Sequence, residues 1–198
     1  MHSYSLSAQD DNVVAFEVRP GDVLKNPVTR YADPPTSERS EISMPFNRWA
    51  NGVAVNVSYE FLVPGGFDLD TAWAVIGQMH ADLNTSPPLE FAFRKSFALN
   101  RLLIVSRAGP AAKNGVEKVT AVGEDPIVRD TWHKVSIETL MGSYGYQRVW
   151  VNGHQALDLA GAVGFDEQRN WYWRMGLYRR AAATTYRVLF RNFRMSRD

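Results

Sequence analysis

The segment Val53–Val63, VAVNVSYEFLV, alternates apolar with polar side chains between Val55 and Phe61. Successive side chains of an extended strand point to opposite faces, so this pattern predicts a strand with one face in the core and the other in solvent. The segment stops at Pro64-Gly65-Gly66, a typical turn sequence. The chain is therefore expected to build a β-sheet with one buried face.

Segments of the same kind, separated by turn signals, follow one another along most of the chain. Asn152-Gly153 closes one of them with a dipeptide that favours tight hairpin turns. Two stretches depart from the pattern: Gly109–Asp130 is expected to be a long polar excursion, and Leu157–Val163 a short helical turn. The expected strands span residues 14–18, 38–42, 53–63, 73–80, 89–94, 101–106, 132–138, 147–151, 172–178 and 186–195.

These elements indicate an all-β fold. Many short strands without strand-to-helix alternation are typical of an antiparallel two-sheet β-jelly roll, a concanavalin-like sandwich. A length of 198 residues fits one domain, which we expect to span residues 1–198.

The composition limits the kind of partner. The formal net charge of +1 argues against a globally basic nucleic-acid binder, and no apolar run is long enough to span a bilayer. The absence of cysteine excludes disulfides and thiolate metal sites. The N-terminus shows no secretory signal pattern, so such a signal is either absent or already removed. We expect a soluble monomer with neither a membrane nor a nucleic acid as partner.

Positive charge is concentrated near the C-terminus. Between Gln168 and Arg197 the chain has eight arginines and no acid. This segment could attract a polyanion, although several of its arginines are expected on the solvent faces of strands.

One stretch inside this basic segment, Tyr172–Tyr178 (YWRMGLY), has two different faces if it is a strand. Tyr172, Arg174 and Tyr178 would share the polar face, and Gly176 would leave a gap there through which a ligand could approach the backbone. Arginine binds carboxylates well. This face could therefore form the floor of an anion-accepting cleft.

Two other expected strands carry polar pairs that could complete such a cleft. Arg39 and Glu41 share a face if their segment is extended, and so do Gln78 and His80. Donors from Arg and Gln could neutralise a sugar carboxylate while the proton next to it is removed. His80 could accept that proton near neutral pH, and Tyr178 could protonate the departing glycosidic oxygen. The set suits β-elimination on a polyuronate.

Each candidate also has a purely structural interpretation. Gln78 and His80 could be the polar end of a core strand, the strand tyrosines could simply pack on the sheet, and Arg39 with Glu41 could form a salt bridge. Hydrolysis is the weaker catalytic alternative, because it needs two carboxylates flanking the scissile bond and Glu41 has Arg39 beside it.

Three motifs resemble, in their order along the chain, the signature blocks of a known family. They are Arg39-Ser40-Glu41, Gln78-Met79-His80 and Tyr172–Tyr178, and this order is that of the jelly-roll polysaccharide lyases, the alginate-lyase-like group. Phe16–Asp22, FEVRPGD, ahead of Glu38–Glu41, ERSE, looks closer to the heparin-lyase-I-like and glucuronan-lyase branch. The resemblance covers nearly the whole chain.

The resemblance implies a role for each matching position. Arg39 and Gln78 would neutralise the carboxylate of the substrate. His80 would act as the base or assist it, and Tyr178 would act as the acid and, in a variant of the mechanism, also as the base. The residues expected to bind the substrate are Arg174, Tyr172 and Glu41.

The resemblance also bears on the substrate and cofactors. Arg174 stands where the alginate enzymes of the group commonly carry lysine, which favours glucuronan or a related polymer over alginate. No redox or organic cofactor is required, and a secreted or periplasmic location is expected. Asp68 and Asp70 could contribute to a structural Ca²⁺ site, but two acids fall short of a full oxygen cage.

A different class of function fits the same fold. A non-catalytic, lectin-like carbohydrate-binding module could use aromatic side chains on a sheet face. Such a module would not need the four catalytic candidates to converge on one groove. Their placement in the structure is therefore the observation that separates the two functions.

Overall fold

The computed structural model describes residues 2, 4–25, 32–44, 48–66, 71–81, 85–95, 100–110, 116–165 and 170–197. These residues form thirteen β-strands, and none of the elements among them is a helix that could cross a membrane. The strands are β1 (Leu6–Asp10), β2 (Val13–Val18), β3 (Ser37–Ser43), β4 (Ala54–Leu62), β5 (Trp73–His80), β6 (Leu89–Arg94), β7 (Arg101–Gly109), β8 (Val116–Pro126), β9 (His133–Leu140), β10 (Gly142–Val151), β11 (His154–Phe165), β12 (Tyr172–Arg180) and β13 (Tyr186–Arg197).

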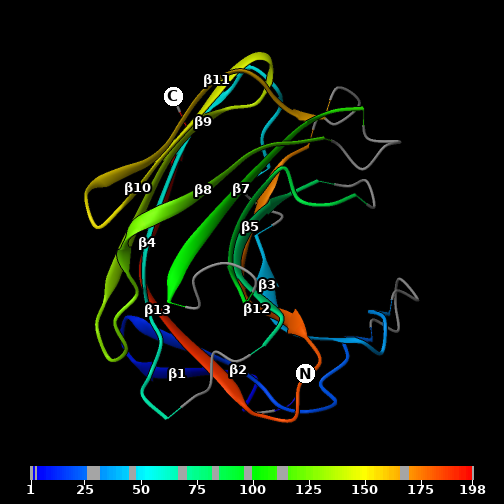
Figure 1. The fold of residues 1–198 in the computed structure, drawn as a ribbon, viewed down its shortest axis with the longest axis vertical. Coiled ribbons are helices and arrows are strands. Elements are labelled where there is room, and N and C mark those ends of the chain that lie inside the picture. The colour runs from blue at the N-terminus through cyan, green and yellow to red at the C-terminus, as the bar shows by residue number, and fades with distance from the viewer. Residues whose placement is uncertain are drawn as a thin grey trace.

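The strands lie in two facing layers (Figure 1). Hydrogen bonding orders the first layer as β1-β2-β13-β4-β9-β10-β11 and the second as β7-β6-β5-β12-β3, with β8 beside β7. The end of β11 pairs in parallel with β7 and joins the layers, whereas the other pairings between the described strands are antiparallel. The expected all-β, two-sheet jelly-roll architecture is confirmed.

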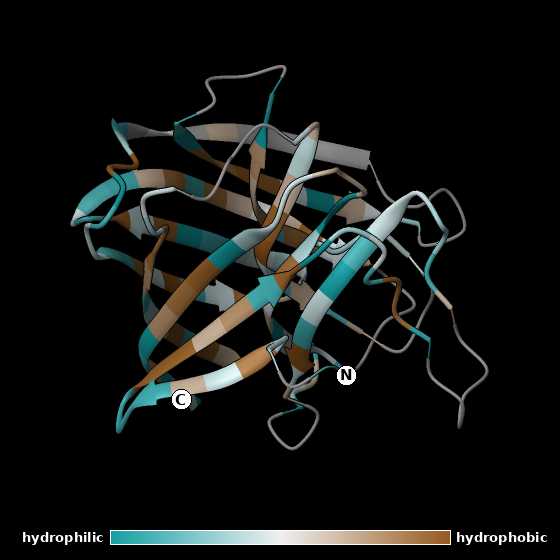
Figure 2. Cartoon of the chain, turned by 90° about the horizontal axis from the view of Figure 1, so that it is seen from below, coloured by the Kyte–Doolittle hydropathy of each residue, from teal (hydrophilic) through white to brown (hydrophobic). Residues whose placement is uncertain are grey.

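The apolar faces of the two layers meet in one core. Along β4 the burial alternates residue by residue, as the pattern of Val53–Val63 predicted, and Figure 2 shows hydrophobic and hydrophilic positions alternating along the strands. Tyr59 of β4 is 1% exposed, and its ring lies 5.8 Å from that of Trp173 in β12. Burial raises the pKa of the Tyr59 hydroxyl far above its ordinary value. Removal of the apolar core side chains from water is the main force that holds the layers together.

Two expectations about local structure are wrong. Leu157–Val163, expected to be helical, belongs to β11, because the Asn152-Gly153 turn folds the chain straight back along β10. Val116–Pro126, within the expected polar excursion, is β8 and pairs with β7. Both segments become strands because a neighbouring strand satisfies their backbone groups, and that information is absent from their own residue pattern.

An irregularity in β5 decides which of its side chains leave the core. Strict alternation would place Ile76 and Gln78 on the same face. The register of β5 against β6 shifts between Val75 and Gly77, however. Ile76 therefore stays in the core, whereas Gln78 bonds to a partner on the opposite face of the layer.

Candidate active site

The candidate residues lie on three adjacent strands of the second layer, β3, β12 and β5 (Figure 1). Residues that are opposite each other on paired strands project to the same side of a sheet. We call the side of these strands that points away from the core the site face. The cross-strand pairs on it are Tyr172 with His80, Arg174 with Gln78, Gly176 with Glu41, and Tyr178 with Arg39.

Four of these residues form a continuous cluster, which we call the clamp: Arg39, Glu41, Gln78 and Tyr178. The Arg39 guanidinium donates from Nη1 to Glu41 Oε2 over 3.2 Å, and the Gln78 amide nitrogen donates to Glu41 Oε1. The same guanidinium lies over the Tyr178 ring, 3.9 Å from its centroid. The Glu41 side chain is only 3% exposed, so this carboxylate is a fixed anchor for both donors.

Two residues that sequence reasoning missed support the clamp from outside. Asp33 is buried and accepts a 2.9 Å hydrogen bond from Arg39 Nη2. The ring of Trp73 meets that of Tyr178 edge-on at 4.9 Å. Asp33 lies in a polar stretch without periodicity, so nothing in the sequence indicated it. Alternation could not place Trp73 either, because Trp73 shares a face with Gln78 and His80 only through the register shift between Val75 and Gly77.

The other three candidates form a second cluster beside the clamp. His80 stacks on Tyr172 at 5.9 Å between ring centroids, and Arg174 Nη2 donates to the Tyr172 hydroxyl over 2.9 Å. His80 Nδ1 lies 2.8 Å from the carbonyl oxygen of Ala81 and 2.9 Å from its backbone nitrogen, so the tautomer decides whether Nδ1 donates or accepts. If Nδ1 carries the proton and donates there, the lone pair that accepts a proton is on Nε2. Arg48, also missed, places its guanidinium 5.2 Å from the centre of the Tyr172 ring.

The two clusters are contiguous along the sheet. Arg174 and Gln78 are cross-strand partners, and His80 follows Gln78 by two residues on β5. The four catalytic candidates are therefore gathered on one face of one layer rather than dispersed over both sheets. A carbohydrate-binding module would not require this arrangement.

The polar surface continues onto β6 and β7. Glu90 is the β6 partner of Gln78 and is 7% exposed. It accepts hydrogen bonds of 3.1 Å from Arg94 and from Arg107. Sequence reasoning missed this group, although the alternation within Leu89–Arg94 places Glu90 and Arg94 on the face opposite the apolar side chains.

Gly176 does not leave the open gap that was expected. Its φ is 142°, and a Cβ there would lie 2.7 Å from the Cα of Glu41 and 2.9 Å from the ring of Phe16. The space is filled by β3 instead of by a ligand. The glycine is needed because only a residue without a side chain lets β3 approach β12 so closely, and this approach puts Glu41 and Arg39 beside Tyr178.

No group of three or more metal-ligating side chains occurs in the described part of the chain. Asp68 and Asp70, the pair considered for Ca²⁺, fall within residues 67–70, which lie outside the described residues.

Comparison with known proteins gives a consistent result. A family model described as "Polysaccharide lyase" matches residues 3–194. Among solved structures, an endo-beta-1,4-glucuronan lyase from the fungus Trichoderma reesei aligns with a TM-score of 0.74 and 13% identity, covering 98% of this chain and 84% of that chain. Alginate lyase AlgAT5 from Polysaccharide Lyase family 7 aligns with a TM-score of 0.70 and 15% identity over 100% of this chain and 84% of that chain.

A third solved structure agrees with these two. Alginate lyase PA1167 from Pseudomonas aeruginosa aligns with a TM-score of 0.68 and 19% identity, covering 100% of this chain and 88% of that chain. A search of curated proteins gave no match. At these identities the solved structures establish the shared fold, while the family model spans almost the entire chain.

Proposed function

The chain belongs to the polysaccharide lyase family, and we propose that it cleaves a 1,4-linked polyuronate by β-elimination. A base removes the proton at C5, and that electron pair forms the C4–C5 double bond. The C4–O4 bond breaks, and O4 leaves with a proton from an acid. The observation that carries the proposal is the clamp, in which Arg39, Glu41, Gln78 and Tyr178 touch one another on one face of one layer.

The clamp offers what the intermediate of this reaction needs. Removal of the C5 proton places a second negative charge next to the sugar carboxylate, and preorganised donors stabilise that charge. The Gln78 amide nitrogen has two hydrogens, of which one is bonded to Glu41, so the other can meet the carboxylate. The Arg39 guanidinium, held in place by Glu41 and Asp33, acts as the second hydrogen-bond donor. We infer that Glu41 acts as a positioning residue for both donors.

The proton transfers are assigned to the two candidates on either side of Gln78. Tyr178 is the acid that protonates O4, and its ring is held by Arg39 and Trp73. His80 is the base in the tautomer whose Nδ1 donates to the carbonyl oxygen of Ala81, because that tautomer leaves the lone pair on Nε2. In the variant mechanism Tyr178 performs both transfers and His80 only assists.

The preferred substrate is glucuronan or a related glucuronate polymer, with alginate as the second choice. Arg174 donates to Tyr172 beside the proposed sugar position, where a guanidinium can bind a carboxylate through two hydrogen bonds and a lysine cannot. One of the similar solved structures is a glucuronan lyase and others are alginate lyases. Residues 1–198 would act as one domain, without a required cofactor, as a secreted or periplasmic monomer.

A substrate panel tests the function directly. The protein is incubated with glucuronan, alginate, hyaluronan and heparin, and the ultraviolet absorbance of the new conjugated double bond is followed. We expect the fastest rise with glucuronan, because Arg174 stands where the alginate enzymes of the group commonly carry lysine. A flat absorbance trace on all four polymers would contradict the proposal, and a faster rise with alginate would contradict only the substrate preference.

Glu41→Gln tests the positioning role of the clamp carboxylate. The substitution keeps the size of the side chain but removes the charge that holds Arg39 and Gln78. We expect kcat/KM to fall by roughly 10-fold to 100-fold, the loss typical of slightly misplaced catalytic groups. Steady-state kinetics should show most of the loss in kcat, with the circular dichroism spectrum unchanged. An unaltered kcat would limit Glu41 to a structural ion pair.

A further inference from the structure

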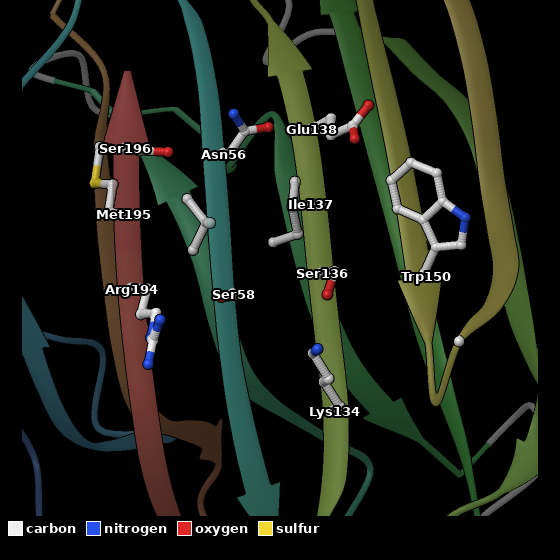
Figure 3. Close-up of a pocket in the computed structure, with 12 residues that line it drawn as sticks. Asn56, Ser58, Lys134, Ser136, Ile137, Glu138, Trp150, Arg194, Met195 and Ser196 are labelled. Carbon is white, nitrogen blue, oxygen red and sulfur yellow. The ribbon is translucent and has the colours of Figure 1, made fainter. Parts of the chain in front are cut away.

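A hollow lies on the first layer and is lined by residues of four neighbouring strands (Figure 3). Its volume is about 720 Å³, and it is formed by β13, β4, β9 and β10. A smaller hollow of about 400 Å³ continues it and shares Ser58, Lys134 and Arg194. Val57 and Ile137 at its floor belong to the core. The hollow is thus separated from the site face by the core of the sandwich.

The residue sizes along one cross-strand row explain the shape of this hollow. Arg194 pairs with Ser58, Ser58 with Ser136, and Ser136 with Trp150, so the four side chains share one face. Two small serines therefore lie between a long arginine and a large indole. Figure 3 shows Arg194 and Trp150 on opposite sides of the two serines. The half-buried Trp150 forms one wall.

The side chains of Lys134 and Arg194 give this hollow positive charge. Both are exposed, and neither forms a salt bridge with another described residue, although Lys134 lies opposite Glu60 on the paired strand. The nearby Glu60 is already bound by Arg191 at 2.7 Å and by Asn192 at 2.9 Å. The hydrogen bond from Asn192 is the main reason why the pKa of Glu60 lies below its ordinary value, and the charge of Lys134 is one further cause.

The remaining acid at the hollow is also engaged. Glu138 lies at the end away from Lys134 and is 3.6 Å from Arg148, which in turn is 3.4 Å from Asp158. The end of the hollow near Lys134 and Arg194 therefore offers two cations whose charge no neighbouring carboxylate neutralises through a salt bridge. This end is complementary to an anionic ligand.

We propose that this hollow is a second binding site for an anionic polysaccharide chain, separate from the place of cleavage. The indole of Trp150 can pack on the apolar face of a pyranose ring, and the hydroxyls of Ser58 and Ser136 can bond to sugar hydroxyls. Lys134 and Arg194 bind the carboxylates. This inference rests on the proposed function for the identity of the polymer, and it adds a surface that keeps the polymer close to the enzyme between cleavages.

Trp150→Ala is the decisive variant, and Tyr144→Ala is its matched control. Tyr144 is on the same strand, is 95% exposed and does not line the hollow. Retardation in native gels that contain glucuronan or alginate gives the affinity, and all variants carry Tyr178→Phe so that the polymer stays intact. We expect Trp150→Ala to weaken binding by about three- to tenfold, as for the loss of one aromatic contact, and Tyr144→Ala to leave it unchanged.

A second variant tests the charge. Lys134→Ala combined with Arg194→Ala should weaken retardation further and make it less sensitive to added salt, because exposed charges are screened by ions. Retardation by neutral dextran to the same extent as by a polyuronate would contradict the role of the two cations. In the active protein, Trp150→Ala should leave the rate of cleavage of a short oligouronate unchanged.

The outcomes separate this inference from the proposed function. If retardation depends on Trp150 but the active protein cleaves none of the polymers, the result would contradict the proposed function and support the second site. Equal retardation of the Trp150→Ala and Tyr144→Ala proteins, or no retardation of the parent by any polyuronate, would overturn the second site. Loss of a concentration-dependent dimer in Trp150→Ala, with retardation unchanged, would also overturn it and identify the hollow as an interface between copies.

Discussion

Tyr178→Phe should lower kcat by about 100-fold to 10,000-fold, the usual contribution of a positioned acid or base. The variant loses one hydroxyl and keeps the ring, so the contacts with the Arg39 guanidinium at 3.9 Å and the Trp73 ring at 4.9 Å can persist. KM should change little, and circular dichroism should show an intact fold. The measurement is the rate at which the conjugated double bond appears on the best substrate of the panel.

Two further variants are needed to interpret this result, one as a control and one to separate the two mechanisms. Tyr172→Phe removes a hydroxyl from the same strand and the same face, where it accepts a hydrogen bond from Arg174, and should retain most of kcat. His80→Gln distinguishes the two mechanisms, because it should abolish turnover if His80 is the base and only reduce it if Tyr178 makes both transfers. Full activity of Tyr178→Phe would remove Tyr178 from the mechanism.

Arg179→Met should lower the free energy of unfolding by about 3–5 kcal/mol, because it leaves a buried carboxylate without its cation. Arg179 is fully buried, and its Nε and Nη2 lie 2.8 and 2.7 Å from Glu38 Oε2. The Glu38 carboxylate also accepts a 2.6 Å hydrogen bond from the backbone of Gly21. The pair joins β3 to β12 one residue away from Arg39 and Tyr178, so its loss should also reduce turnover.

Urea unfolding followed by tryptophan fluorescence measures this loss. The control is Glu17→Gln, which breaks an ion pair between Glu17, 13% exposed, and Arg19, 49% exposed. An ion pair that solvent reaches contributes about 1 kcal/mol or less, so this control should lose far less stability than Arg179→Met. Similar unfolding midpoints for the Arg179→Met and Glu17→Gln proteins would show that the buried pair does not stabilise the junction of β3 and β12.

Much of the fold was predictable because most strands are marked by alternating side chains and by the turn residues at their ends. The alternation in Val53–Val63 gave β4, its buried face and its turn, and Asn152-Gly153 gave the hairpin between β10 and β11. The error at Leu157–Val163 has the opposite cause: its residues carry no strand pattern, and the pairing of β11 with β10 decides its conformation.

The catalytic candidates could be predicted from the sequence, but the residues that hold them in place could not. Arg39, Gln78, His80 and Tyr178 could be proposed from short motifs, because their chemistry is recognisable in isolation. Asp33 could not, since its role depends on a loop that meets Arg39 in space. Their catalytic roles stay predictions until the variants above are measured.

The sequence by itself determined that the chain is an all-β sandwich and which side chains could carry lyase chemistry, because alternation and residue type are local properties. Only the tertiary structure decided that the register shift in β5 turns Gln78 away from the core, that β3 fills the space beside Gly176, and that a row of Arg194, Ser58, Ser136 and Trp150 makes a hollow. The physical reason is that these features depend on how separate strands pair, and pairing is fixed by contacts between residues distant in sequence.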